Sequence, residues 1–201
     1  MSGLQLTFRE LEVADYPVAR RLVASAFAGE PFAVGMFGDS SLERLVGMVD
    51  EYAQWPHLER PLSVVATAGD VLVGAAVATL AGECDLCGGA PDAPAGPMSR
   101  SAEVEFEFQR CCREAHLGAD LPRHAHICTV AVDPFVKGVG LGRRLVVELL
   151  GRLRTAGASC VVLECLTSRE RFYEACGFRT VVEFPDPGGP NLFSVLMRLD
   201  V

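Results

Sequence analysis

Three glycines at alternate positions, Gly138, Gly140 and Gly142, lie between an apolar stretch and an amphipathic stretch. Glycine lets a backbone approach a ligand closely and adopt conformations that other residues resist. The first N–H groups of a helix lack partners within the helix, and the helix dipole adds positive potential there. A glycine loop that opens a helix is therefore suited to bind a pyrophosphate. A tight strand-to-helix turn without a ligand is the alternative.

The spacing of these glycines excludes two other nucleotide-binding motifs. The run lacks the Gly-Lys-Ser/Thr ending of a P-loop. In the dinucleotide-binding fingerprint the third glycine comes three positions after the second, and an acidic residue follows about twenty residues later. Here the third glycine comes two positions after the second, so neither motif fits.

Two side chains are candidates for a general base. Glu164 interrupts the apolar run 161–165, and burial of its carboxyl group would raise its pKa toward a useful value. A structural ion pair with an arginine is the alternative for Glu164. His126 is the second candidate, because we expect it to share a strand face with Cys128 and Val130 and because imidazole titrates near neutral pH.

The eight cysteines are expected to be mostly buried free thiols, since a disulfide framework is typical of short secreted chains. Cys84 and Cys87 resemble half of a zinc knuckle that Cys111, Cys112 or His116 could complete. However, Cys111 and Cys112 are adjacent, and helical periodicity already places them toward the core. The prediction is therefore no metal, with Cys84 and Cys87 on a thiol-bearing loop.

The elements that must position these residues follow from apolar periodicity, which predicts an α/β protein. Strands are expected at 4–9, 62–67, 71–80, 125–132, 160–166, 180–184 and 193–199, and helices at about 15–27, 39–55, 102–116, 141–156 and 168–176. The strand-helix-strand unit at 125–166 predicts parallel pairing, whereas 62–80 predicts a hairpin. We expect a central mixed sheet of about seven strands flanked by helices.

Length and composition limit the classes of protein. The 201 residues predict one domain, 1–201, with a loop-helix insertion at about 81–123. The net charge of -8 disfavours nucleic acid as a partner; it suits a cationic amine, or it serves only solubility. No apolar run reaches membrane-spanning length and no export leader is visible, so we expect a cytoplasmic protein that does not bind membranes.

The segment 129–143 resembles the GCN5-related N-acetyltransferases. Their acetyl-CoA site carries Gln/Arg-x-x-Gly-x-Gly/Ala after a strand that ends in a Val-x-Val-x-Pro-like stretch, and Lys137 to Gly142 looks like that signature. Phe172 to Phe178 is similar to the family's Phe-Tyr-x-x-x-Gly-Phe segment. The two motifs in this order are more specific than either alone. The C-terminal half looks most like the puromycin N-acetyltransferase branch.

The resemblance implies a mixed-sheet fold of this family and an acetyl-CoA-dependent N-acetyltransferase acting on a primary amine of a small molecule. It also implies that the backbone of the strand before the loop holds the pantetheine arm and that the loop amides hold the pyrophosphate. The cofactor-binding residues implied are Val130, Ala131, Val132, Lys137, Gly138, Val139, Gly140, Leu141, Gly142 and Arg143. A homodimer is compatible with the sequence.

Amide formation from a thioester requires a neutral amine, stabilisation of an oxyanion and a proton for the departing thiolate. By resemblance, the hydroxyl of Tyr173 supplies that proton; a structural aromatic is the alternative. A backbone N–H near Val130 would stabilise the oxyanion, and Glu164, His126 or ordered water would accept the amine proton. Two other functions stay open: an inactive acyl-CoA-binding or sensory module on the same fold, and an interaction protein that binds no CoA.

The acceptor amine is expected to contact the first two helices and the insertion. The candidate residues there are Glu30, Trp55, His57 and Glu105.

Overall fold

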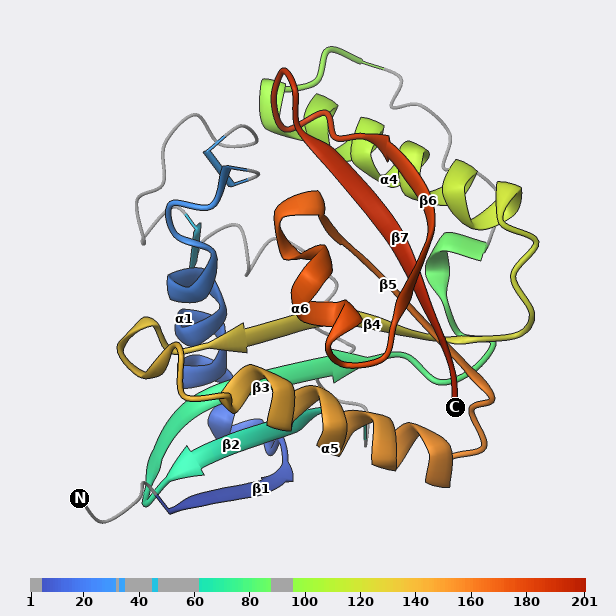
Figure 1. Cartoon of the computed structure of the whole chain (residues 1–201). Helices are drawn as coiled ribbons and strands as arrows, with labels where there is room; N and C mark the ends of the chain where they lie inside the picture. The colour runs from blue at the N-terminus through green and yellow to red at the C-terminus, as the bar shows by residue number, and fades with distance from the viewer. Residues whose placement is uncertain (1–4, 32, 35–44, 47–61, 88–95) are drawn as a thin grey trace.

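The structure is a computed structural model, and it describes residues 5–31, 33–34, 45–46, 62–87 and 96–201. Seven strands form one sheet in the order β1-β2-β3-β4-β5-β7-β6 (Figure 1). The strands are β1 (Leu6–Glu10), β2 (Val64–Ala68), β3 (Val71–Ala78), β4 (Ala125–Val132), β5 (Cys160–Leu166), β6 (Arg179–Pro185) and β7 (Phe193–Asp200). The helices are α1 (Tyr16–Phe27), α4 (Arg100–Gly118), α5 (Leu141–Thr155) and α6 (Glu170–Glu174).

The pairing of the strands confirms the predicted mixed sheet. β2 and β3 form the expected antiparallel hairpin, and β4 pairs with β5 in parallel. The connection between β4 and β5 runs through α5, as a parallel pair requires. The helix predicted at 39–55 lies almost wholly outside the described residues, and the prediction of a single domain stays a prediction.

Helices cover both faces of the N-terminal half of the sheet. Val64 and Ala66 of β2 belong to the same buried cluster as Leu145 of α5. Val65, which lies between them, belongs to the cluster that contains Leu22 of α1. Since successive strand residues point to opposite faces, α1 and α5 pack on opposite sides of β2, β3 and β4 (Figure 1).

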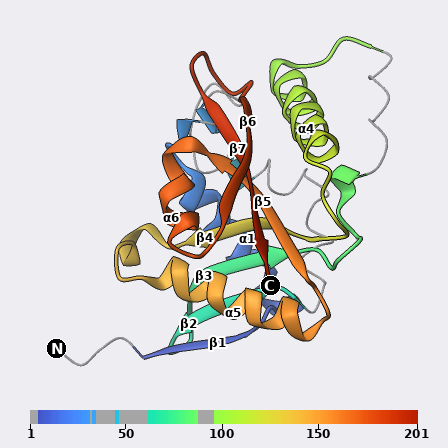
Figure 2. The ribbon, with the colours of Figure 1, turned by 45° about the vertical axis from the view of Figure 1, so that its right-hand side comes forward.

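The segment predicted as an insertion contains the helix that covers the C-terminal half of the sheet, α4. Cys112 and Ala115 of α4 pack in a buried cluster with Val162 of β5 and Leu196 of β7. In the turned view, α4 stands on the far side of β5 and β7 from α6 (Figure 2). The C-cap of α4 lies one residue later than the predicted cap Gly118, because Gly118 is the last helical residue and Ala119 takes the C-cap position.

None of the helices in the described part of the chain is long and apolar enough to cross a membrane.

Candidate active site

The centre of the sheet is open between β4 and β5. The two strands pair only at Ala125–Val161 and His126–Val162, and they then diverge (Figure 1). β4 continues its antiparallel pairing with β3 as far as Val132, so among the described residues its other edge has no strand partner beyond His126. A backbone edge of this kind can pair with an extended ligand.

A bulge at Cys128 interrupts β4. Residues 127 and 129 pair with consecutive residues of β3, so Cys128 opposes none of them. The extra residue reverses the alternation of side chains along the strand. As a result Ile127, rather than His126, packs in the same cluster as Val130. The prediction that His126 shares a strand face with Val130 is therefore wrong.

The glycine loop follows β4 directly and ends at the first residue of α5. Asp133 caps a short 3₁₀ turn by accepting a hydrogen bond from the Phe135 amide at 2.8 Å, and the exposed segment 137–140 follows. Gly140 is the N-cap of α5 with φ 80°, a left-handed conformation that favours glycine. The free amides of the α5 N-terminus thus meet an exposed loop, as pyrophosphate binding requires.

The loop contacts the second motif through Gly142. A Cβ atom built on Gly142 would lie 3.3 Å from Cζ of Phe172 on α6 and 3.7 Å from Cγ2 of Val132. The ring of Phe172 in turn lies edge-on to Tyr173, with 4.8 Å between the centroids. This packing brings the start of α5, the end of β4 and Tyr173 together. Phe172 was predicted as part of the second motif, but its contact with the glycine loop was not.

Tyr173 is packed through its ring, while its hydroxyl group is left without a partner among the described residues. The ring packs on Phe172 and, at 6.0 Å between centroids, on Phe178. Burial raises the pKa of the hydroxyl well above its usual range. The group therefore keeps its proton at neutral pH, which is the state that a general acid needs.

Glu164 and His126 lie together on the α4 face of the sheet. Nε2 of His126 donates to Oε2 of Glu164 at 2.6 Å, and Nε2 of His116 on α4 donates to Oε1. Tyr173 instead packs on the α5 face, and no contact in the described chain links it to this group. The structure thus brings together two of the three predicted catalytic residues.

The surroundings of Glu164 correct two expectations. Its partners are two histidines rather than an arginine. Burial favours the neutral carboxyl group, but the charge of His126 and the hydrogen bonds from His116 and His126 outweigh it and hold the pKa of Glu164 well below its usual range. The expected rise of this pKa is therefore wrong. The base role of Glu164 or His126 stays a prediction.

The thiol-bearing loop lies against histidines rather than against the cysteine pair of α4. Cys84 and Cys87 contact His116, and Cys87 also contacts His124. Cys112 is buried in the core, as predicted. Burial disfavours a thiolate at Cys84, but hydrogen bonds from the histidines outweigh it and lower the pKa of Cys84 to about 3.

Two of the four candidate acceptor residues are described. Glu30, just beyond α1, pairs with Arg169, which immediately precedes α6. This ion pair places the end of α1 beside the tyrosine motif. Glu105 on α4 accepts a hydrogen bond from Gln109 at 3.0 Å. Trp55 and His57 lie outside the described residues.

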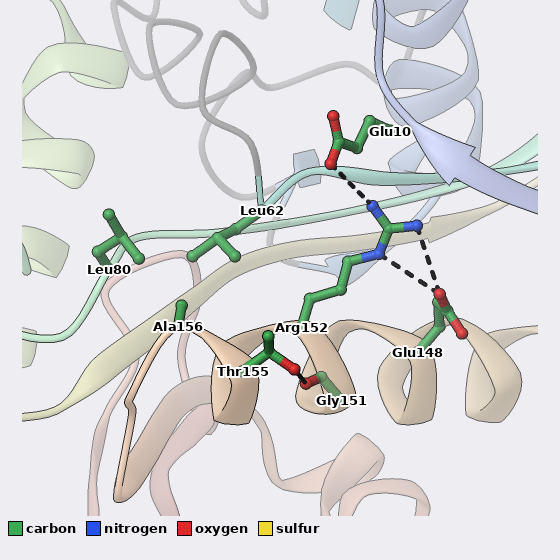
Figure 3. Close-up of a pocket in the computed structure, with 8 residues that line it drawn as sticks. All are labelled: Glu10, Leu62, Leu80, Glu148, Gly151, Arg152, Thr155 and Ala156. Atoms are coloured by element: carbon green, nitrogen blue, oxygen red, sulfur yellow. Dashed lines mark hydrogen bonds and ion pairs between the residues drawn. The ribbon is translucent and has the colours of Figure 1, made fainter.

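A hollow beside the C-terminal half of α5 is remote from the glycine loop. Its wall includes Arg152, which pairs with Glu148 at 3.3 Å and with Glu10 at 3.5 Å (Figure 3). Arg152 lies eleven residues along the helix from Leu141, which at 1.5 Å per residue is about 16 Å. The paired charges and this distance separate the hollow from the motifs described above.

Known proteins share both sequence and fold with this chain. Residues 34–178 match the family model of the acetyltransferase (GNAT) family. A glucosamine 6-phosphate N-acetyltransferase of Arabidopsis thaliana is 32% identical over 77 residues, which are 38% of this chain and 46% of the relative. That of Oryza sativa subsp. japonica is 33% identical over 91 residues, or 44% and 50%. The chain thus spans about half the length of these curated relatives, and the likeness to the puromycin branch stays a prediction.

Solved structures agree in fold. A mosquito arylalkylamine N-acetyltransferase like 5b has a TM-score of 0.74 at 15% identity, covering 98% of this chain and 100% of that one. A candidate acetyltransferase from Salmonella typhimurium with its cofactor acetyl-CoA has a TM-score of 0.55 at 16% identity, covering 98% and 94%. At such identities the likeness establishes the fold alone. The family match, which covers most of the chain, establishes that this protein belongs to the acetyltransferase (GNAT) family.

Proposed function

We propose that the protein transfers an acetyl group from acetyl-CoA to a primary amine of a small molecule. The observation that carries this proposal is the continuous path from the unpaired edge of β4 to the glycine loop at the start of α5. Pantetheine is extended and carries amides, so it can pair with the backbone of Val130 to Val132. The pyrophosphate then lies against the amides of Lys137 to Arg143, and the acetyl-CoA held by the Salmonella typhimurium structure agrees with this use of the fold.

The chemistry needs three groups around the thioester. The neutral amine attacks the acetyl carbon, and a backbone N–H on the open edge of β4, near Val130, stabilises the oxyanion. As the intermediate collapses, the C–S bond breaks and the Tyr173 hydroxyl gives its proton to the CoA sulfur. Glu164, His126 or ordered water takes the proton that the amine loses.

The class of acceptor is proposed from the relatives. The two plant enzymes are named for glucosamine 6-phosphate, a small-molecule amine, and an acidic protein attracts cations. A cytoplasmic location and a homodimer stay predictions.

The test is a thermal-shift titration with acetyl-CoA, followed by thiol release and product mass with a panel of small primary amines. We expect stabilisation by acetyl-CoA and a mass gain of one acetyl group on at least one amine. Binding without turnover on any amine would favour the inactive acyl-CoA-binding module. A lack of binding would remove the cofactor assignment.

A further inference from the structure

Four side chains from three separate segments meet between the insertion and the sheet. Cys84 and Cys87 lie at the 3₁₀ turn Asp85–Cys87, His116 lies in the last turn of α4, and His124 immediately precedes β4. Their sulfur and nitrogen ligand atoms all lie within 4.8 Å of one another. We propose that Cys84, Cys87, His116 and His124 bind one Zn²⁺ ion in a closed structural site.

The distances between the ligand atoms fit a single tetrahedral ion. With Zn–S at about 2.3 Å and Zn–N at about 2.05 Å, a tetrahedral site separates sulfur from nitrogen by about 3.6 Å. Nδ1 of His116 lies 3.9 Å from Sγ of Cys84 and 3.8 Å from Sγ of Cys87. Nε2 of His124 lies 3.4 Å from Sγ of Cys87. An ion at the centre of the four atoms needs only small side-chain adjustments.

The remaining ring nitrogens of both histidines are held as in established zinc sites. A ligating histidine almost always donates its other N–H to a carboxylate or a backbone carbonyl. Nε2 of His116 donates to Glu164, and Nδ1 of His124 donates to the Pro122 carbonyl at 2.8 Å. In the neutral rings these two bonds hold the proton on the far nitrogen, so that the nitrogens facing the thiols offer lone pairs to a metal ion.

The neighbouring group of His116, His126 and Glu164 does not form a second metal site. Two ligands of one tetrahedral ion at about 2.1 Å would lie about 3.4 Å apart. Nε2 of His126 and Oε2 of Glu164 are only 2.6 Å apart, which is a hydrogen-bond distance. Glu164 therefore orients His116 from outside the zinc site.

The composition and burial of the site favour zinc and a structural role. Two thiolates with two imidazoles in a tetrahedral array suit Zn²⁺, and a full set of four protein ligands leaves no open position for a substrate. Cys84, His116 and His124 are buried, whereas Cys87 is exposed and gives the ion a way in. The bound ion fastens the insertion to β4 and, through His116, holds Glu164 in place.

The decisive measurement is the metal content of the full chain. The protein is purified under reducing conditions without chelator or affinity tag and analysed by elemental mass spectrometry. We expect about one zinc per chain. Cys87→Ser should weaken zinc affinity at least about 100-fold in competition with a chromophoric chelator, because one of four ligands is lost. Cys111→Ser, a partly buried cysteine of α4 outside the ligand set, is the matched control and should retain the ion.

Two further readouts do not depend on enzyme activity. Co²⁺ added to the metal-free chain should give the visible bands of a tetrahedral thiolate site, and Cys87→Ser should change them. Removal of zinc should lower Tm by about 5 °C or more, with recovery on adding zinc.

The proposal fails if the metal-free, reduced chain binds neither zinc nor cobalt. It also fails if Cys87→Ser binds zinc as tightly as the unchanged chain, or if intact mass shows a stable Cys84–Cys87 disulfide that forms in place of metal binding. Acetyl-CoA binding, measured on the same samples, reports on the proposed function separately.

Discussion

Replacement of Tyr173 by phenylalanine removes one oxygen from a ring whose contacts stay in place. The ring keeps its packing on Phe172 and Phe178, at 4.8 and 6.0 Å between centroids. Since the hydroxyl bonds to no other described residue, the free energy of unfolding should change by no more than about 0.5 kcal/mol, or about 2 °C in Tm. Loss of the proton donor should lower turnover by about 10²–10⁴-fold, equivalent to about 3–5 kcal/mol in the activation barrier.

The assay is thiol release with an amine for which chemistry is rate-limiting, confirmed by single-turnover measurement. Affinity for acetyl-CoA should change little, because the proposed contacts are made by the backbone. Burial raises the pKa of Tyr173, so turnover of the unchanged enzyme should show no loss attributable to this group up to about pH 10. Tyr16→Phe on α1 makes the same chemical change away from the site and serves as the control. Turnover of Tyr173→Phe within about threefold of the unchanged enzyme would refute the acid role.

Three other changes test separate parts of the structure. Gly140→Glu should abolish acetyl-CoA binding in a thermal-shift titration, because a carboxylate would face the pyrophosphate. The control is Gly140→Ala, which has the same strained φ but no charge and should bind acetyl-CoA more tightly than Gly140→Glu. Equal binding by the two variants would contradict the electrostatic reason. Glu164→Gln should cost about 3 kcal/mol in urea unfolding, because His116 and His126 lose a buried anionic partner, and an unchanged midpoint would show that the pairs contribute nothing. Asp15→Asn should lower stability at pH 7 by about 0.5–1 kcal/mol, because the Arg9 hydrogen bonds hold the pKa of Asp15 below its usual range. The difference should shrink in acid as Asp15 becomes protonated in the folded state, and a difference that stays constant as the pH falls would contradict this cause.

Local patterns predicted most of the fold. β4 and β5 have the predicted bounds and the predicted parallel pairing, because apolar runs and helix-starting glycines act within a few residues of sequence. The glycine loop could be located for the same reason. Its assignment to acetyl-CoA depended on the resemblance to a known family, since a strand-to-helix turn without a ligand uses the same residues.

The features that sequence patterns missed depend on packing between distant segments. The bulge at Cys128 places His126 on the opposite face of the sheet from Val130, and no residue type in β4 predicts this bulge. The contact between His116 and Glu164 joins positions 48 residues apart and exists only because α4 docks on β5. The same docking brings His116 and His124 to the two thiols, at a spacing outside the common zinc-finger patterns.

The divergence of β4 from β5 also bears on how the protein avoids self-association. An unpaired strand edge is normally a template for aggregation when it lies at the rim of a sheet. Here the edge lies inside the sheet, and its two sides converge at Ala125 and His126. A second polypeptide that added as a strand would need about 4.8 Å on each side. There is no such space at Ala125 and His126, where β4 and β5 pair with each other. A partner chain could therefore pair with β4 only beyond His126, where the two strands have separated, and not along the whole strand.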